Sequence, residues 1–323
     1  MRRPGWTRCA IAALVALAVA SCGGGSNRDG GGGTARVATR TALLPGTGRP
    51  QVTIGDKNFT EQFVLGSLYL QALEAQGFSV VLNRNIGPTA VTLQALSTGK
   101  LGMYPEYLDT WDTSVAGYQR PFPTARAAYR AGQEYALAHG FKLLHPTPFS
   151  DTDAIAVNFN YAVQNGLTTI GNLGKVASEI TFGAPPQFQQ DPGGLPALES
   201  SYGFEPGQFK PLEIGQQYQA LDQDQVQAAD VNTTDGQLLT GGYTLLRDPR
   251  RVFGWGNVVP VASMQVLERE GPAFSATINK VSSLLTLKAM RQLNAAVDIQ
   301  NQNPATVARQ FLIAHGLIPD RPG

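Results

Sequence analysis

Cysteine is nearly absent from this sequence of 323 residues, and its scarcity excludes two kinds of stabilising site. Cys9 and Cys22 are the only two cysteines, and both lie close to the N-terminus. Neither a disulfide framework nor a cysteine-based zinc site is therefore expected. The three histidines, His139, His145 and His315, are not spaced as metal ligands. We expect no metal site and no cofactor.

An excess of charge of either sign is also lacking. The chain has 25 Lys and Arg against 24 Asp and Glu, a net charge of +1. If an N-terminal leader carrying Arg2, Arg3 and Arg8 is removed, 22 basic and 24 acidic residues remain, for a net charge of −2. Because nucleic-acid binding depends on clustered Lys and Arg, we expect no nucleic-acid partner.

The motifs of common catalytic sites are missing as well. The sequence has no serine elbow, no phosphate-binding glycine loop and no His/Cys metal set. The acidic pairs Asp151 with Asp153 and Asp222 with Asp224 could bind a cation or exchange protons. Such short acidic spacings are frequent in loops, however, and without catalytic partners they do not predict an enzyme.

One long apolar run is present, at residues 10–20, and it indicates an export signal. Arginines precede it, and Val19-Ala20-Ser21 leads directly into Cys22. The run is shorter than the roughly 20 apolar residues of a transmembrane helix. We predict a lipoprotein signal peptide at residues 1–21 and lipid on Cys22, so that the protein is extracytoplasmic and anchored to the cell membrane. The alternative is cleavage elsewhere, with Cys22 left as an unmodified thiol.

The next segment, residues 22–50, is predicted to be a flexible tether. Its first part is nearly all glycine, and such a composition buries too little apolar area to offset the entropy of ordering the chain. A coil of this length has a reach on the order of 30 Å. The tether would let a folded body move above the membrane.

From residue 52 onward, short apolar strands alternate with helices. Asn58 with Glu61, and Thr89 and Thr124, have the positions of helix caps, and Gly77, Gly99 and Gly140 those of helix stops. The predicted strands are residues 52–55, 78–82, 101–104, 141–144, 154–159, 180–183 and 225–231; the predicted helices are residues 59–76, 89–99, 124–140, 273–285, 287–302 and 304–315. Single helices between strands favour parallel pairing, and two such α/β series favour two lobes.

Five segments of the chain resemble a known family. They are residues 54–62 (IGDKNFTEQ), 87–91 (GPTAV), 104–110 (YPEYLDT), 234–236 (TDG) and 307–312 (VARQFL). Their order and spacing resemble the substrate-binding proteins of ABC importers for glycine betaine, choline and carnitine. The resemblance covers nearly the whole chain from residue 52.

The resemblance implies an α/β, two-lobed periplasmic-binding-protein fold of type II, the venus flytrap, with a central ligand cleft. Lobe one would comprise residues 51–150 plus 256–323, and lobe two residues 151–255. The implied partners are a small-molecule solute and an ABC permease in the membrane with its ATPase, and the implied state is a monomer. Closure of the lobes around the solute would shift a pre-existing equilibrium.

The resemblance also implies which residues line the cleft. Lys57 and Thr110 match positions that hold a ligand carboxylate, and Tyr107 matches one wall of an aromatic cage. Aromatic faces suit a quaternary ammonium because that group has no hydrogen-bond donor, and each contact contributes roughly 0.5–2 kcal/mol. The same alignment places Trp255 as a further aromatic, unless it shifts by one residue to Gly256.

Three positions depart from the family pattern. Asp153 stands where the family has a cage tyrosine, Asn232 stands where it has another, and Asp191 falls where an arginine grips the carboxylate, unless an insertion moves that match. An acidic residue in place of arginine repels a ligand carboxylate. The predicted ligand is therefore polar, polyhydroxylated or aromatic. The alternatives are a low-affinity choline or glycine betaine binder and a ligand-sensing lipoprotein without transport.

Each of these residues also has an ordinary structural interpretation. These interpretations are a solvated Lys57, a core position for Tyr107 or its neighbour Tyr104, solvent-facing Asp153 and Asp191, and a hinge-packing Trp255. Solvent exposure is the commonest fate of aspartate, whereas the glycines on both sides of Trp255 allow a close backbone approach in a cleft.

Overall fold

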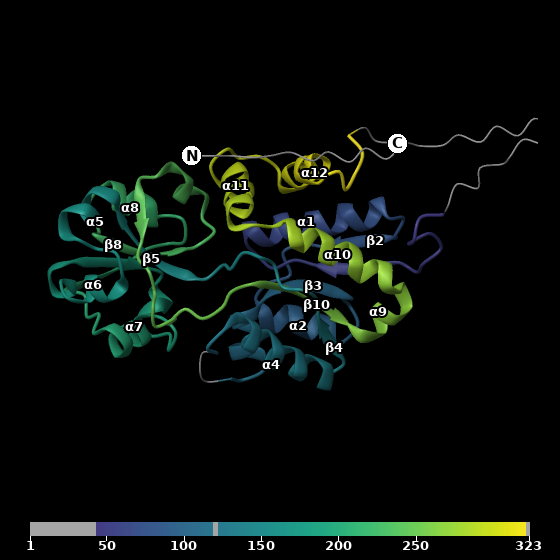
Figure 1. Cartoon of the computed structure of the whole chain (residues 1–323), viewed down its shortest axis with the longest axis horizontal. Helices are drawn as coiled ribbons and strands as arrows, with labels where there is room; N and C mark the ends of the chain where they lie inside the picture. The colour runs from purple at the N-terminus through teal and green to yellow at the C-terminus, as the bar shows by residue number, and fades with distance from the viewer. Residues whose placement is uncertain (1–42, 119–121, 321–323) are drawn as a thin grey trace, which may run out of the picture. The chain divides into compact units, whose positions relative to one another are not determined.

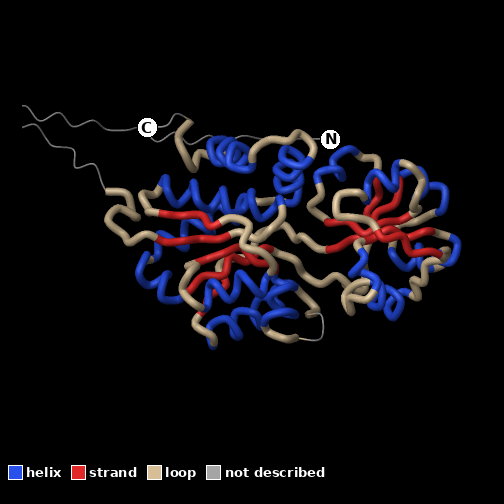
Figure 2. Tube along the Cα trace, turned by 180° about the vertical axis from the view of Figure 1, so that it is seen from behind, coloured by secondary structure: helices blue, strands red, loops and turns tan. Residues whose placement is uncertain are grey.

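The computed structural model describes residues 43–118 and 122–320. All of them belong to one compact unit, Leu43–Gly323. The strands fall into two groups of five (Figures 1 and 2). The predicted signal peptide, the predicted lipid site at Cys22 and most of the predicted tether lie outside the described residues.

The first sheet has the order β2-β1-β3-β10-β4. Its strands are β1 (Val52–Gly55), β2 (Val80–Asn83), β3 (Met103–Tyr107), β4 (Phe141–Leu143) and β10 (Val258–Ser263). β1 pairs in parallel with β2 and β3, as predicted, but β10 is antiparallel to both β3 and β4. The sheet is mixed because the chain enters β10 from the second group of strands. A single crossover helix, which would have made the pairing parallel, does not precede it.

Helices cover both faces of this sheet (Figure 1). They are α1 (Thr60–Ala75), α2 (Thr89–Ser97), α3 (Leu108–Thr110), α4 (Ala125–Ala138), α9 (Met264–Glu270), α10 (Pro272–Leu284), α11 (Leu287–Asp298) and α12 (Pro304–Ala314), with a π-helical turn at Trp111–Val115. Along β10, Val258 and Ala262 belong to the core under α1, α10 and α12, and Val259 and Val261 belong to the core under α4. This alternation is the two-residue period of a strand buried on both faces.

The second sheet has the order β7-β6-β8-β5-β9. Its strands are β5 (Asp153–Asn158), β6 (Thr181–Ala184), β7 (Gln208–Pro211), β8 (Ala228–Asn232) and β9 (Tyr243–Leu245). Its helices are α5 (Phe159–Asn165), α6 (Ile170–Gly174), α7 (Leu195–Tyr202) and α8 (Gln217–Asp222), with 3-10 turns at Ala177–Glu179, Pro186–Gln189 and Gly236–Thr240. β5 is antiparallel to β8 and β9, so this sheet is mixed as well.

Two segments connect the sheets, and they contact each other. Ser150 and Asn257 form an isolated antiparallel bridge, and the Asp151 amide donates to the Gly256 carbonyl at 2.9 Å. A Cβ on Gly256 would lie 1.6 Å from the Asp151 carbonyl oxygen, so only glycine fits at this crossing. Where each lobe begins along these segments remains a prediction.

The helix starts show where local sequence signals held and where they failed. Thr124 caps α4 as predicted, accepting a hydrogen bond from the Ala127 amide. The predicted Asn58/Glu61 capping pair is wrong, because the N-cap of α1 is Phe59 and no side chain caps it. Thr89 is the first residue of α2 and not its cap. Both Glu61 and Thr89 instead bond to distant residues.

No helix among the described residues is both long and apolar enough to cross a bilayer.

Candidate functional site

Lys57 lies in the turn after β1, where it is buried and already paired. Only 5% of it is exposed, and its ammonium forms an ion pair with Glu106 and donates to Thr89 Oγ1 at 3.0 Å. Thr89 Oγ1 in turn donates to Glu106 Oε2 at 3.0 Å. A buried charge requires such a partner. Lys57 is therefore not a solvated lysine, and its positive charge is balanced within the protein.

Tyr107 ends β3 beside this ion pair. The Lys57 ammonium lies 5.3 Å from the centroid of its ring, and the Phe59 ring stacks on it with centroids 5.9 Å apart. The Tyr107 hydroxyl donates to Glu61 Oε1 at 3.0 Å, and Asn294 Nδ2 donates to Glu61 Oε2 at 2.9 Å. Burial raises the pKa of Glu61 above its ordinary value. These contacts hold the Tyr107 ring in one orientation.

Tyr104, three residues earlier on β3, is also buried, so both tyrosines pack into the protein. They lie on opposite faces of the sheet, Tyr104 in the core under α4 and Tyr107 in the core under α1. Their spacing of three residues explains this separation, because side chains alternate between the two faces along a strand. Pro105 and Glu106 lie between them.

Thr110 lies in the short helix α3 directly after β3 and contacts a carboxylate. Its amide donates to Asp109 Oδ1 at 2.7 Å, and its hydroxyl donates to the same oxygen at 3.4 Å. Burial raises the pKa of Asp109 to about 7, and the charges of Asp153 and Glu106 add to this effect. Sequence reasoning did not select Asp109 as a site residue, although it precedes Thr110 directly and follows Tyr107 by two residues.

Asp153 and Asn232 are opposite each other in the second sheet, so the structure brings these two predicted residues together. Asn232 Nδ2 donates to Asp151 Oδ1 at 3.4 Å, and the Asn232 amide donates to Asp235 Oδ2 at 3.0 Å. Desolvation by the surrounding protein raises the pKa of Asp153 to about 6, and the negative charges of Asp191 and Asp235 contribute to this increase. No hydrogen bond among the described residues involves the Asp153 carboxylate.

Asp230 is a second residue that sequence reasoning missed. It lies on β8 opposite Ile155 and is 6% exposed. Its Oδ1 atom has no hydrogen-bond partner among the described residues. Burial raises the pKa of Asp230 well above its ordinary value, and the charges of Asp153 and Asp235 contribute. A lone aspartate inside an apolar strand was the signal that could have revealed it.

Asp191 and Trp255 have contacts of their own. Asp191 is exposed, and its Oδ1 accepts from the Gly193 amide at 3.0 Å, although its charge reaches Asp153. Trp255 Nε1 donates to the Phe122 carbonyl at 2.8 Å, and the Arg251 guanidinium lies 3.9 Å from the centroid of its ring. A ligand role for either residue stays a prediction.

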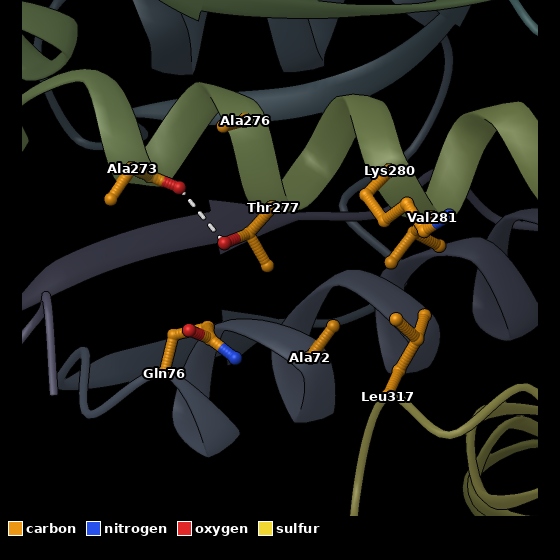
Figure 3. Close-up of a pocket in the computed structure, with 8 residues that line it drawn as sticks. All are labelled: Ala72, Gln76, Ala273, Ala276, Thr277, Lys280, Val281 and Leu317. Carbon is orange, nitrogen blue, oxygen red and sulfur yellow. Dashed lines mark hydrogen bonds between the residues drawn. The ribbon is translucent and has the colours of Figure 1, made fainter. Parts of the chain in front are cut away.

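Two hollows on the surface lie away from these residues. One, of about 300 Å³, lies between α1 and α10, with Ala72 and Leu317 among its lining residues (Figure 3). The other, of about 540 Å³, lies beside α6 and α7 and includes Lys175 and Arg250. None of the predicted ligand residues lines either hollow.

Comparison with known proteins agrees with the two-sheet fold. Residues 50–314 match the family described as the substrate-binding domain of ABC-type glycine betaine transport systems. The glycine-betaine-binding protein of Pseudomonas aeruginosa is 31% identical over 278 residues, which cover 83% of this chain and 88% of that protein.

Solved structures give the same result. Apo YehZ from Escherichia coli is 29% identical, with a TM-score of 0.69 over 83% of this chain and 99% of that one. A glycine betaine/carnitine/choline ABC transporter structure gives a TM-score of 0.76 at 24% identity, over 82% of this chain and 99% of that one. These neighbours are two-lobed solute-binding proteins, which confirms the predicted fold class. The chain therefore belongs to the family of substrate-binding domains of ABC-type glycine betaine transport systems.

Proposed function

We propose that this member of the family delivers a polar, polyhydroxylated or aromatic solute to an ABC importer. Family membership makes the chain the extracytoplasmic substrate-binding component of a transport system and not an enzyme. The proposal concerns the altered pocket and the class of ligand that it accepts.

The observation that carries the proposal is the state of Lys57. Its ammonium is paired with the buried carboxylate of Glu106, so it has little net charge to offer a second carboxylate. Asp109, which interacts electrostatically with Lys57, adds a further acidic group to the candidate site. Like charges placed across a binding site can cost several kcal/mol. Both features disfavour a ligand that carries a carboxylate, such as a betaine.

The other predicted residues supply polar contacts and one aromatic surface. Asp153 and Asn232 share one face of the second sheet and offer a carboxylate and an amide to hydroxyl or amine groups. Tyr107 offers an aromatic ring whose orientation is held by Glu61. Thr110 and Asp191 add a hydroxyl and a second carboxylate, and Trp255 a second aromatic ring.

A second candidate is low-affinity binding of choline or glycine betaine. It is favoured by the Tyr107 ring, which an ammonium group already approaches to 5.3 Å, and glycine betaine is in the name of the P. aeruginosa relative. Choline lacks a carboxylate and so avoids the repulsion that a betaine would meet.

We further propose that lipid on Cys22 anchors the protein and that a monomer presents its ligand to the permease. Support comes from the pattern of residues 1–22 in the sequence. More than one acyl chain is needed for stable anchoring, which is what the modified N-terminal cysteine of a lipoprotein would supply.

A thermal-shift screen tests the proposed ligand class. The protein, purified from the membrane fraction of producing cells, is heated with glycine betaine, choline, carnitine, sugars, polyols and phenols. A ligand at 100 times its dissociation constant adds about 2.7 kcal/mol to the free energy of unfolding. We expect a sugar, polyol or phenol to give the largest shift. Binding of glycine betaine at micromolar or lower dissociation constant would refute the proposal.

A further inference from the structure

The second sheet places two carboxylates on one face, one behind the other. Asp153 is opposite Asn232, and Ile155 is opposite Asp230. Cross-strand partners share a face, and side chains two residues apart on a strand point to the same side. Asp153 and Asp230 are therefore diagonal neighbours on one face, with Asp153 at the exposed end of β5 and Asp230 one pair deeper.

The deeper carboxylate is incompletely bonded. Asp230 is 6% exposed, and its Oδ1 atom has no hydrogen-bond partner among the residues that the structure describes. A buried polar atom left without a partner costs free energy, and a charged one costs more. Asp153, which lies between Asp230 and solvent on the same face, accepts no hydrogen bond from the described part of the chain either. Both groups lack a donor.

The positive charges beside Asp109, Asp235 and Trp255 have partners of their own. Lys57 pairs with Glu106, Arg291 Nε donates to the Thr233 carbonyl at 2.8 Å, and Arg251 covers the Trp255 ring. The groups whose charges reach Asp153 or Asp230 are acidic: Asp109, Asp191 and Asp235. The described His, Cys, Asp and Glu residues form no group of three or more suited to a metal ion. An organic cation with hydrogen-bond donors suits this environment.

We propose that the solute carries a protonated primary amine whose N–H groups bind the carboxylates of Asp153 and Asp230. This inference rests on the proposed function and narrows its ligand class. A quaternary ammonium has no N–H group and cannot satisfy these oxygens. A primary ammonium has three donors and forms charge-assisted hydrogen bonds, which are about twice as strong as neutral ones. The aromatic or hydroxylated remainder of the solute would contact Tyr107 and Asn232.

Matched pairs of compounds test the inference by calorimetry. Ethanolamine is compared with choline, and phenethylamine with its N,N,N-trimethyl derivative, so that each pair differs only in methylation of the nitrogen. Glucosamine is compared with glucose, which replaces the amine by a hydroxyl. We expect the primary amine to bind about tenfold or more tightly in the pairs that bind, as hydrogen bonds to charged groups allow.

Substitutions of the two aspartates test whether the amine binds at this site. Asp230→Asn and Asp153→Asn each replace a carboxyl group by an amide of nearly the same shape that cannot ionise, and each should weaken binding of the primary amine about tenfold. Asp224→Asn is the matched control, because Asp224 lies at an exposed position in the turn between α8 and β8 and its φ of 53° suits asparagine. This control should change affinity less than about twofold. If Asp230→Asn fails to fold, as judged by circular dichroism, the more exposed Asp153→Asn carries the test.

The outcomes of these measurements separate the two proposals. Tighter binding of the primary amine, lost in Asp153→Asn and kept in Asp224→Asn, supports the inference. A quaternary compound that binds more tightly than its primary partner overturns it, as does a neutral polyol or phenol that binds most tightly of all; in the latter case the proposed function stands. Glycine betaine as the tightest ligand, or no binding by any of these compounds, overturns both.

Discussion

Lys57 and Glu106 illustrate how a residue with the position of a ligand contact can also be part of the interior. Both side chains are buried, and Glu106 accepts from the Lys57 ammonium, the Thr89 hydroxyl and the Tyr107 amide. Burying two charges costs solvation free energy, and their attraction offsets this cost only when the remaining hydrogen bonds are made. The three donors to Glu106 meet that condition. Any ligand that approaches Lys57 competes with them.

The first prediction concerns this ion pair. Glu106→Gln leaves the Lys57 ammonium buried without a counter-charge, so the free energy of unfolding should fall by roughly 3–5 kcal/mol. Urea unfolding followed by circular dichroism measures it. Glu134→Gln on the exposed face of α4 is the control and should change stability by less than about 0.5 kcal/mol. A loss below about 1 kcal/mol in Glu106→Gln would mean that the pair is solvated.

The second prediction concerns pH. Asp109 has an ordinary pKa of 3.8, which burial raises to about 7 in the folded protein. Between these two values the folded state holds a proton that the unfolded state has released, so stability falls as pH rises from about 4 to about 7. Asp109→Asn should remove part of this dependence, on the order of 1–2 kcal/mol after allowance for solvent contact.

Urea unfolding at pH 5 and pH 7.5 measures the effect. The wild-type protein should be more stable at pH 5, and the difference between the two pH values should shrink in Asp109→Asn. Asp224→Asn, at an exposed turn, should leave the difference unchanged. An equal pH dependence in Asp109→Asn and the wild type would show that Asp109 ionises freely in the folded state.

Helix α11 packs against the short segment that follows β8 of the second sheet. Arg291 Nε donates to the Thr233 carbonyl at 2.8 Å, and Asn294 Nδ2 donates to the Thr234 carbonyl at 3.1 Å and to Glu61. Gly236, which begins the next 3-10 turn, packs against the backbone of Ala295. One helix thus contacts both the segment that follows β8, next to Asn232, and Glu61, which orients Tyr107. Substitutions at this contact should therefore affect site residues of both sheets.

The third prediction tests that packing. A Cβ on Gly236 would lie 2.5 Å from the Ala295 Cα, which is closer than real contacts allow. Gly236→Ala should therefore lower the free energy of unfolding by about 1–3 kcal/mol, the usual cost of overpacking. Gly242→Ala is the control, because its Cβ would meet nothing closer than 3.6 Å. Equal stability of the two variants in urea would mean that α11 can move away from the turn.

Across the whole molecule, the two sheets are linked by two segments, and the predicted ligand residues come from both sides of that link. Lys57, Tyr107 and Thr110 belong to the first sheet and its turns, and Asp153 and Asn232 belong to the second. Binding proteins of this type trap ligand through hinge closure, in which the ligand supplies the differential binding free energy. The crossing at Gly256 has no room for a side chain.

The fourth prediction concerns attachment of the molecule to the membrane. Cys22→Ser removes the proposed lipid site, and the protein should move from the membrane fraction to the soluble fraction of the producing cells, because acyl chains supply the anchoring free energy. Cys9→Ser is the matched control, since Cys9 lies inside the predicted signal peptide. Immunoblotting of the two fractions measures the result. Retention of Cys22→Ser in the membrane fraction would contradict lipid anchoring.

Most of the fold could be predicted from local patterns. The predicted strands and helices, the Thr124 cap and the proline start of α12 depend on residues that are neighbours in sequence, and family resemblance supplied the two-lobed arrangement. Strands β7, β9 and β10 and helices α5 to α9 were not predicted. The antiparallel entry of β10 could not be predicted from these patterns. Its pairing partner β3 is far away in the chain, and strand direction depends on the path between them.

The sequence by itself determined seven of the strands, the long helices, the family and the predicted export signal, because each depends on residue types at short, regular spacings. Only the tertiary structure decided what the site residues contact. Lys57 meets Glu106 across 49 residues, and Asn294 meets Glu61 across 233. Glu61 therefore bonds Tyr107 and not its own helix, and Asp230 lies buried without a donor. Such contacts depend on packing between distant segments, which no local pattern encodes.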